Sequence, residues 1–180
     1  MLSAMLEQPQ NYRPESRHQV RVEPLRIFSE MAAQDIGQLM PELDPRFSGN
    51  PTTRQWLEGT INSDSHEQIV AYDLRQEVAR IVGALTVSEI REPALGSYGY
   101  IAGVIVSTQA RGLGIGLLML EQAEVWCRSK NMPHVELITE KHRSSAIHMY
   151  EQWGAERVTD GRDVKDGILY TKSFEYVKDV

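Results

Sequence analysis

Hydrophobic positions along the chain follow two spacings, which predict strands and helices in turn. Apolar, often β-branched residues in unbroken or alternating runs are typical of strands. Such runs occupy residues 20–24, 67–72, 78–90, 98–106, 135–139 and 168–174. Apolar residues spaced three and four apart are typical of amphipathic helices. That spacing occurs in residues 27–40, 53–61, 113–130 and 146–153. The pattern therefore predicts a mixed α/β chain with about four helices.

Proline, glycine and threonine set the expected ends of these elements. Pro41 predicts that the first helix ends before it, because the residue preceding a proline avoids the helical region. Thr52 or Thr53 can cap the second helix, and Gly154 can close the last one. Gly83 predicts a break in the long third strand, since glycine inside a strand often marks a bulge.

The lengths of the connections predict how the strands pair. Residues 73–77 form a turn too short for a crossover, so the strands on either side must run antiparallel. Residues 113–130 form a helix between the fourth and fifth strands, which predicts a parallel pair with a right-handed connection. Asp160, Gly161 and Asp163 indicate the turn of a final hairpin.

A glycine-rich junction joins the fourth strand to the long helix. Gly112, Gly114 and Gly116 allow positive φ angles or a close approach to a ligand. Free N–H groups and the positive end of the helix dipole make such a junction an anion site. Arg111 adds a charge that can bind phosphate in a forked geometry. The junction therefore predicts a phosphate cradle.

Two well-known phosphate-binding loops do not match this junction. A P-loop needs a Gly-Lys pair six residues after its first glycine, and neither Gly112 nor Gly114 is followed by one. A dinucleotide fingerprint, G-x-G-x-x-G, would begin at Gly112 but meets Leu117 where its third glycine should stand. The sequence therefore disfavours a dinucleotide-binding enzyme and excludes a P-loop nucleotidase.

Composition narrows the function classes further. The chain has 180 residues, 19 Lys plus Arg against 25 Asp plus Glu, and a net charge of −6, which argues against a nucleic-acid partner. Cys127 is the only cysteine, so neither a disulfide framework nor a cysteine metal cluster is expected. No apolar run is long enough for a membrane span, and no signal pattern begins the chain. We expect a cytoplasmic protein with a flexible arm at residues 1–19 and one domain at residues 20–180, without a metal.

Two blocks resemble the signature of the GNAT superfamily of acetyl-CoA-dependent N-acyltransferases. The first is Arg111-x-x-Gly114-x-Gly116, which matches [QR]-x-x-G-x-[GA] between a strand and a helix. The second is residues 144–155, in which Ala146, Tyr150 and Gly154 fall in register with the family's later segment. Two positions of that segment depart from the pattern, with Arg143 in place of the frequent Asn and Ala155 in place of the frequent Phe.

This resemblance implies a fold and a co-substrate. The fold is a mostly antiparallel sheet of six to seven strands, in which the fourth and fifth strands are parallel and splay apart. Acetyl-CoA would lie in the gap, its pantetheine against the main chain of the fourth strand and its diphosphate on the amides of the glycine loop, with Arg143 meeting a phosphate. The residues so implied are Val104, Ile105, Val106, Arg111, Gly112, Leu113, Gly114, Ile115, Gly116, Leu117 and Arg143.

The resemblance also implies catalytic roles. Tyr150 matches the position whose hydroxyl protonates the departing sulfur, although a tyrosine in a short helix can also serve only as core. Residues 98–106 contain no acid, so the strand carboxylate that many relatives use as base is absent. Glu140 and His142 are the nearest titratable candidates for a base. A water relay without a dedicated base is the leading hypothesis.

The expected activity is transfer of an acetyl group from acetyl-CoA to a primary amine of a small molecule or peptide. The alternative is a non-catalytic, acyl-CoA-binding regulatory module. The resemblance places the acceptor pocket at residues 31–61 and 161–167, where several acids would favour a cationic amine such as a polyamine, an aminoglycoside or a lysine side chain. A homodimer is compatible with the family, but no stretch of the sequence specifies one.

Overall fold

The computed structural model of the chain describes residues 19–47, 53–75, 77–93, 96–158 and 167–174. The expected arm, apart from Gln19, and the expected hairpin turn at residues 160–166 lie outside these described residues. The strands are β1 (Val20–Pro24), β2 (His66–Asp73), β3 (Arg80–Glu92), β4 (Gly96–Val106), β5 (His134–Glu140), β6 (Glu156–Arg157) and β7 (Gly167–Ser173). The helices are α1 (Glu30–Leu43), α2 (Thr53–Ile61), α3 (Ile115–Ser129) and α4 (Ser144–Gln152), with short 3₁₀ turns η2 (Pro45–Phe47) and η3 (Thr108–Ala110).

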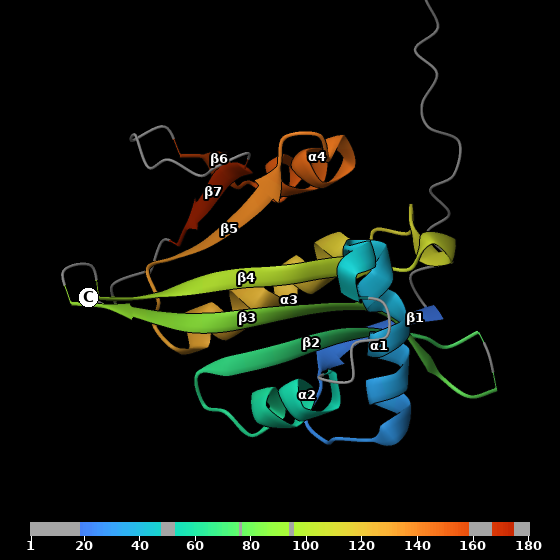
Figure 1. The fold of residues 1–180 in the computed structure, drawn as a ribbon. Helices are drawn as coiled ribbons and strands as arrows, with labels where there is room; N and C mark the ends of the chain where they lie inside the picture. Colours follow the sequence, from blue (N-terminus) through green and yellow to red (C-terminus); the bar gives the residue numbers. More distant parts are fainter. Residues whose placement is uncertain (1–18, 48–52, 76, 94–95, 159–166, 175–180) are drawn as a thin grey trace, which may run out of the picture.

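Seven strands form one sheet in the order β1-β2-β3-β4-β5-β7-β6. Strands β4 and β5 pair in parallel across α3, and every other neighbouring pair is antiparallel. The predicted mixed fold, with a parallel fourth and fifth strand, is confirmed. Strands β4 and β5 diverge toward the end at which α4 begins (Figure 1).

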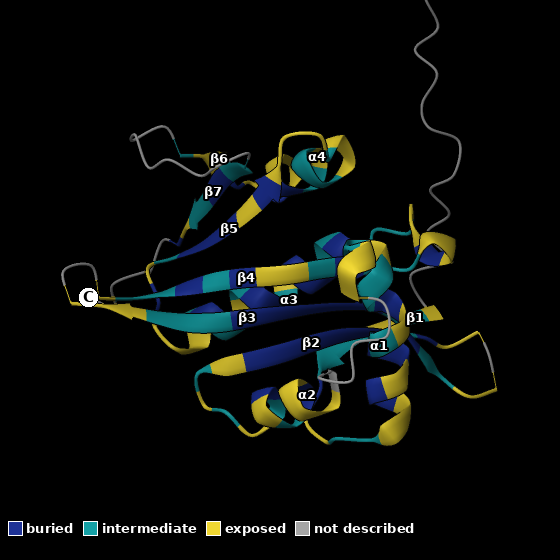
Figure 2. Ribbon diagram, in the orientation of Figure 1, coloured by how far each residue is buried: buried dark blue, intermediate teal, exposed yellow. Residues whose placement is uncertain are grey.

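Helices cover both faces of the sheet. Helices α1 and α2 lie in front of β2 and β3 in Figure 1, and α3 lies behind β3 and β4. Alternate residues of one strand serve the two faces, because Ile69 packs with Met119 of α3 whereas Val70 packs with Leu57 of α2. All four of these side chains are fully buried. Strand β2 is accordingly dark over most of its length in Figure 2, as is the middle of β3.

The expected end of the first helix was wrong. Pro41 lies inside α1, which continues to Leu43. A proline removes one backbone donor and disfavours the preceding turn. Here the turn persists because the Asp44 amide donates to the Met40 carbonyl at 3.1 Å, and because Met40 and Leu43 pack against the core under α1. Tertiary packing therefore overrides the local signal.

Several other boundaries differ from their predictions. Strand β3 continues through Gly83 without a break, but its pairing with β2 shifts there, with Ala71 opposite Gly83 and Tyr72 opposite Ile81, so the bulge that this glycine indicated is present. Helix α3 begins at Ile115 and not at residue 113. Helix α4 begins at Ser144, after an N-cap at Arg143, two residues before its expected start.

Candidate active site

The inner edges of β4 and β5 separate partway along the strands. The two strands pair only from Gly99 with Val135 to Ile101 with Leu137. Beyond that point β4 stays bonded to β3 as far as Val106, and β5 stays bonded to β7 as far as Glu140. Each strand is thus held on its outer side while its inner side faces a gap. Backbone groups along such an edge can pair with an extended ligand that carries amides.

A bulge interrupts β4 at the mouth of this gap. Thr86 of β3 pairs with Ala102, and Ala84 pairs with Ile105, so β4 has one residue more than β3 over this stretch. Gly103 has φ +64°, the left-handed conformation that the first residue of a glycine bulge adopts. Ala102 and Gly103 are exposed in the gap (Figure 2). The bulge therefore redirects backbone polar groups of β4 at the point where the strands part.

The glycine loop has the geometry of an anion cradle. Gly112 and Gly114 have φ +79° and +74°, and a Cβ at either position would meet nothing within 4 Å. Gly114 is the N-cap of α3 and supplies no side-chain hydrogen bond, while the first helical bond runs from the Leu118 amide to the Gly114 carbonyl. The N–H groups of the first turn therefore lack helical partners and lie at the positive end of the dipole.

Gly116 serves a different purpose from the other two motif glycines. It is buried in the first turn of α3, and a Cβ there would overlap the Met149 sulfur of α4. Small size at this position lets α3 and α4 approach closely. A side chain at this position would have to displace the flexible end of Met149, whether or not the residue also contacts a phosphate.

A second helix begins at the same cavity. The cleft beside the glycine loop has a volume of about 690 Å³ and includes Ser144, Ser145 and Ala146 from the start of α4. The N-cap of α4, Arg143, also supplies no side-chain cap. Two helix N-termini without side-chain caps thus face one cleft, and their dipoles reinforce each other at an anion placed between them.

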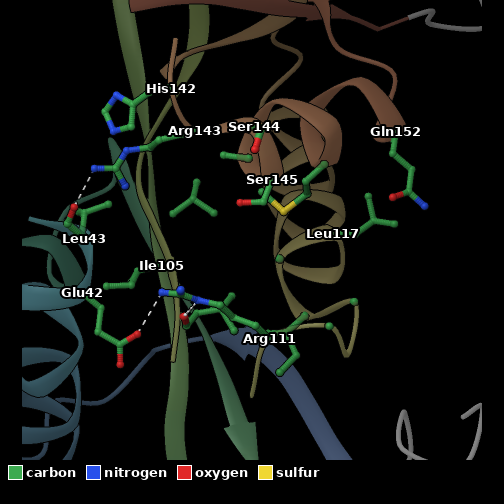
Figure 3. Close-up of a pocket in the computed structure, with 18 residues that line it drawn as sticks. Glu42, Leu43, Ile105, Arg111, Leu117, His142, Arg143, Ser144, Ser145 and Gln152 are labelled. Atoms are coloured by element: carbon green, nitrogen blue, oxygen red, sulfur yellow. Dashed lines mark hydrogen bonds and ion pairs between the residues drawn. The ribbon is translucent and has the colours of Figure 1, made fainter. Parts of the chain in front are cut away.

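Two arginines border the larger cleft, and both guanidinium groups point toward α1 (Figure 3). Arg111 donates to the Val106 carbonyl at 3.1 Å and to Glu42 Oε2 at 3.0 Å. Arg143 donates to the Leu43 carbonyl at 2.9 Å and to Glu140 Oε2 at 2.5 Å. The end of α1 is consequently held from two sides.

A smaller cleft of about 330 Å³ adjoins the first one and contains Tyr150. The Tyr150 side chain is buried, and its ring lies 5.9 Å from the Tyr170 ring. Burial raises the pKa of Tyr150 to about 12, against a smaller opposing effect of the Arg143 charge. Within the described part of the chain, no group hydrogen-bonds to its hydroxyl. The phenol is therefore neutral at physiological pH and has a proton to donate.

The two base candidates lie in different clefts. Glu140 borders the smaller cleft, and its hydrogen bond with Arg143 holds the pKa of the carboxyl below its usual range. A depressed pKa makes Glu140 a weak base at neutral pH. His142 borders the larger cleft, with Nε2 3.7 Å from Glu140 Oε2 and a side chain that is 78% exposed. Their catalytic roles stay predictions.

Most of the predicted coenzyme residues come together. Those that line the larger cleft are Val104, Ile105, Val106, Arg111, Gly112, Gly114, Ile115, Gly116, Leu117 and Arg143, whereas Leu113 is not among its lining residues. Sequence reasoning placed Glu42 among the acids of the acceptor pocket at residues 31–61, whereas its side chain lines the larger cleft. It did not single out Leu43 or Gly103, although a glycine inside a predicted strand was a signal for the bulge. No local pattern indicated that the end of α1 would reach the glycine loop.

Searches for other site types add two findings. Among the described residues, no group of three or more His, Cys, Asp or Glu side chains could hold a metal ion. None of the helices in the described ranges has the length and apolar character that a membrane span needs.

Known proteins share the fold. The structure is similar to an acetyltransferase from Streptococcus agalactiae 2603, with a TM-score of 0.68 at 14% identity over 87% of this chain and 99% of that one. It is similar to Arabidopsis thaliana NAA60 in complex with a bisubstrate analogue, with a TM-score of 0.67 at 13% identity over 87% and 99%. A chain of the NatC complex bound to Gag peptide and CoA gives a TM-score of 0.61 at 20% identity over 85% and 96%.

These identities are low enough that they show the fold alone. A comparison with curated proteins finds no significant match. The family model of the acetyltransferase (GNAT) family matches residues 34–155, which is more than half of the chain and includes both the glycine loop and α4. The chain therefore belongs to the GNAT acetyltransferase family.

Proposed function

We propose that this protein is an N-acetyltransferase that transfers the acetyl group of acetyl-CoA to a primary amine of a small molecule or peptide. The observation that carries the proposal is the convergence of two helix N-termini without side-chain caps on one cleft beside the splayed strands. That arrangement suits a ligand with phosphates at one end and amides along its length. The family match and the CoA-bound NatC structure support the same ligand.

The residues present fit this coenzyme. The N–H groups of the first turn of α3 bind the diphosphate, in the open space that a Cβ at Gly112 or Gly114 would fill. The inner edge of β4 from Val104 to Val106 pairs with the pantetheine amides. Arg111 stands beside the cradle with its charge already matched by Glu42, so the main-chain amides provide most of the phosphate binding.

The groups that would take part in acetyl transfer lie at the smaller cleft. When bound, acetyl-CoA supplies a thioester carbonyl that a neutral amine can attack directly. The backbone groups that the bulge at Gly103 exposes would stabilise the charge that the oxygen of that carbonyl gains. As the new C–N bond forms and the C–S bond breaks, Tyr150 donates its proton to the departing thiolate. Water carries away the proton that the amine releases, since Glu140 is already paired with Arg143.

The acceptor approaches through the smaller cleft, which Ile138 and Tyr100 border together with Tyr150. Ile138 is 44% exposed there, so the wall offers apolar contact as well as polar groups. Peptides are included among the candidate acceptors because the NatC structure holds a Gag peptide. Small polycations remain candidates because the chain carries a net charge of −6.

A panel of amines tests the proposal. The protein is incubated with acetyl-CoA and, separately, spermidine, kanamycin, a peptide with a free α-amine, and an N-acetylated peptide with one lysine. Thiol release above the rate without amine, together with the acetylated product in a mass spectrum, is the expected result for at least one amine. Absence of thiol release with every amine, combined with no binding of any acyl-CoA, would refute the proposal.

A non-catalytic, acyl-CoA-binding regulatory module is the second candidate. One observation favours it, because the two acids among the described cleft residues, Glu42 and Glu140, are each paired with an arginine and not free to act as a base. Binding of acetyl-CoA without thiol release for any amine in the panel would decide for this alternative.

A further inference from the structure

Glu42 is the one acid among the described residues that line the larger cleft. Its Oε2 atom accepts three hydrogen bonds: from the Thr108 amide at 2.8 Å, from the Thr108 hydroxyl at 2.6 Å and from Arg111 at 3.0 Å. Arg111 is fixed further by the Val106 carbonyl. A carboxylate in an anion-binding cleft would weaken binding of the anion, so its presence calls for a structural role. The three hydrogen bonds of Glu42 supply that role. They tie the end of α1 to the turn that precedes the glycine loop.

The residue after Glu42 connects this tie to the acceptor. Leu43 lines both clefts, and its Cδ2 would lie 3.9 Å from a Cβ placed on Gly103, so it covers the bulge of β4. The Leu43 carbonyl accepts from Arg143 on the other side (Figure 3). The last turn of α1 therefore separates the larger cleft, proposed for the coenzyme, from the smaller cleft, proposed for the acceptor. Its position depends on Arg111 and Arg143.

The charge balance of the cleft distinguishes two roles for Arg111, binding a phosphate and positioning α1. A guanidinium that faced the cleft alone would attract phosphate with its full charge. Arg111 instead forms an ion pair with Glu42, so the pair brings little net charge to the cradle. The free N–H groups of α3 do not depend on that pair. Loss of both charges of the pair should then disturb α1 more than it disturbs coenzyme binding.

We propose that Glu42 and Arg111 form a clasp that positions the last turn of α1, and with it Leu43, against the bulge of β4. Both are positioning residues for the acceptor. The link to acetyl transfer rests on the proposed function, whereas the clasp itself does not. Because Thr108 and Arg111 belong to the segment that leads into the phosphate cradle, the clasp also joins the coenzyme loop to the acceptor wall.

Hydrogen exchange of the backbone amides tests the clasp directly. Glu42→Gln, Arg111→Gln and the double variant are compared with wild type by mass spectrometry over residues 36–47. Exchange at the end of α1 should rise about tenfold in Glu42→Gln and about threefold in Arg111→Gln, in which Thr108 still donates to Glu42. The double variant should exchange no faster than Glu42→Gln, because both changes act on the same contact. Glu23→Gln, which breaks the comparably exposed Arg21–Glu23 pair on β1, is the matched control and should leave that segment unchanged.

Two further measurements separate positioning from phosphate binding. The affinity for acetyl-CoA, by calorimetry, should stay within about threefold of wild type in the double variant, which keeps the charge balance of the cleft, whereas the KM for the peptide with a free α-amine should rise at least about fivefold. A loss of acetyl-CoA affinity of tenfold or more with unchanged exchange would overturn the proposal and make Arg111 a phosphate ligand. If wild type binds no acyl-CoA, the proposed function fails, while the exchange comparison still decides for or against the clasp.

Discussion

Replacement of Tyr150 by phenylalanine removes one hydroxyl from the smaller cleft and keeps the ring that packs against Tyr170. Because no described group hydrogen-bonds to that hydroxyl, its loss leaves no buried partner unsatisfied. The free energy of unfolding should change by less than about 1 kcal/mol, which corresponds to about 2–4 °C in Tm for a chain of this size. The variant therefore isolates the chemistry of the hydroxyl.

The expected loss of activity follows from the role of the proton. General acid catalysis contributes about 10²–10⁴-fold. We expect kcat of Tyr150→Phe to fall about 100-fold, which raises the barrier by about 2.7 kcal/mol. The affinity for acetyl-CoA should stay within about twofold, since Tyr150 lies in the acceptor cleft and not among the residues of the larger one.

The pKa of Tyr150, raised to about 12, adds a second readout. The folded pKa lies above that of an exposed tyrosine, so this stabilisation is complete below about pH 10 and is lost as the pH rises through about 12. The difference corresponds to roughly 3 kcal/mol. Wild type should therefore lose more unfolding free energy between pH 10 and 12 than Tyr150→Phe does. In the same way, the kcat of wild type should show no loss from ionisation of this phenol below pH 10.

Steady-state thiol release with the best amine of the panel measures kcat, and calorimetry measures the acetyl-CoA affinity. Tyr170→Phe is the matched control, because its hydroxyl binds Glu151 and Arg157 and lines neither cleft. That control should keep kcat within about twofold. A Tyr150→Phe variant that is folded, binds acetyl-CoA and keeps kcat within about threefold of wild type would refute the role of Tyr150 as the acid.

Three further predictions concern the stability of the fold and the accessibility of the cysteine. Gly116→Val should lower stability by about 1–3 kcal/mol through overpacking of α3 against α4, seen as a fall of several degrees in Tm, because its side chain extends beyond the Met149 sulfur that a Cβ alone already reaches. Cys127 should not react with Ellman's reagent at pH 8 until the protein is denatured, because burial raises the pKa of this thiol to about 12. Asp35→Ala should lower the free energy of unfolding in urea by about 1–3 kcal/mol, since it leaves the buried Ile81 amide without the carboxylate that accepts from it.

The sequence was most informative where local chemistry decides structure. The β-branched run at residues 101–106 and the amphipathic stretch at residues 113–130 predicted a buried strand followed by a helix, and the structure has β4 and α3 there. Positive φ at Gly112 and Gly114 follows from the absence of a Cβ, so the cradle could be anticipated from residue types alone. The parallel pairing of β4 and β5 followed from the length of the helix between them.

Features that depend on distant partners could not be predicted in this way. Glu42 meets Arg111 across 69 positions and Arg143 meets the Leu43 carbonyl across 100, and no periodicity encodes such contacts. Pro41 gave a local signal for the end of a helix, and burial of the following turn overrode it. The sequence also could not distinguish Gly114, which faces open space, from Gly116, which faces Met149.

Calorimetric titration of coenzyme A into wild type and into Gly114→Ala tests the central claim most directly, that amides exposed at the start of α3 hold the diphosphate. A Cβ at this position meets no protein atom within 4 Å and has a backbone strain cost of only about 1–2 kcal/mol, so the variant should fold. The account predicts one-to-one binding to wild type and at least about a tenfold loss of affinity in Gly114→Ala. Equal affinities in two folded proteins, or no heat with wild type, would contradict it.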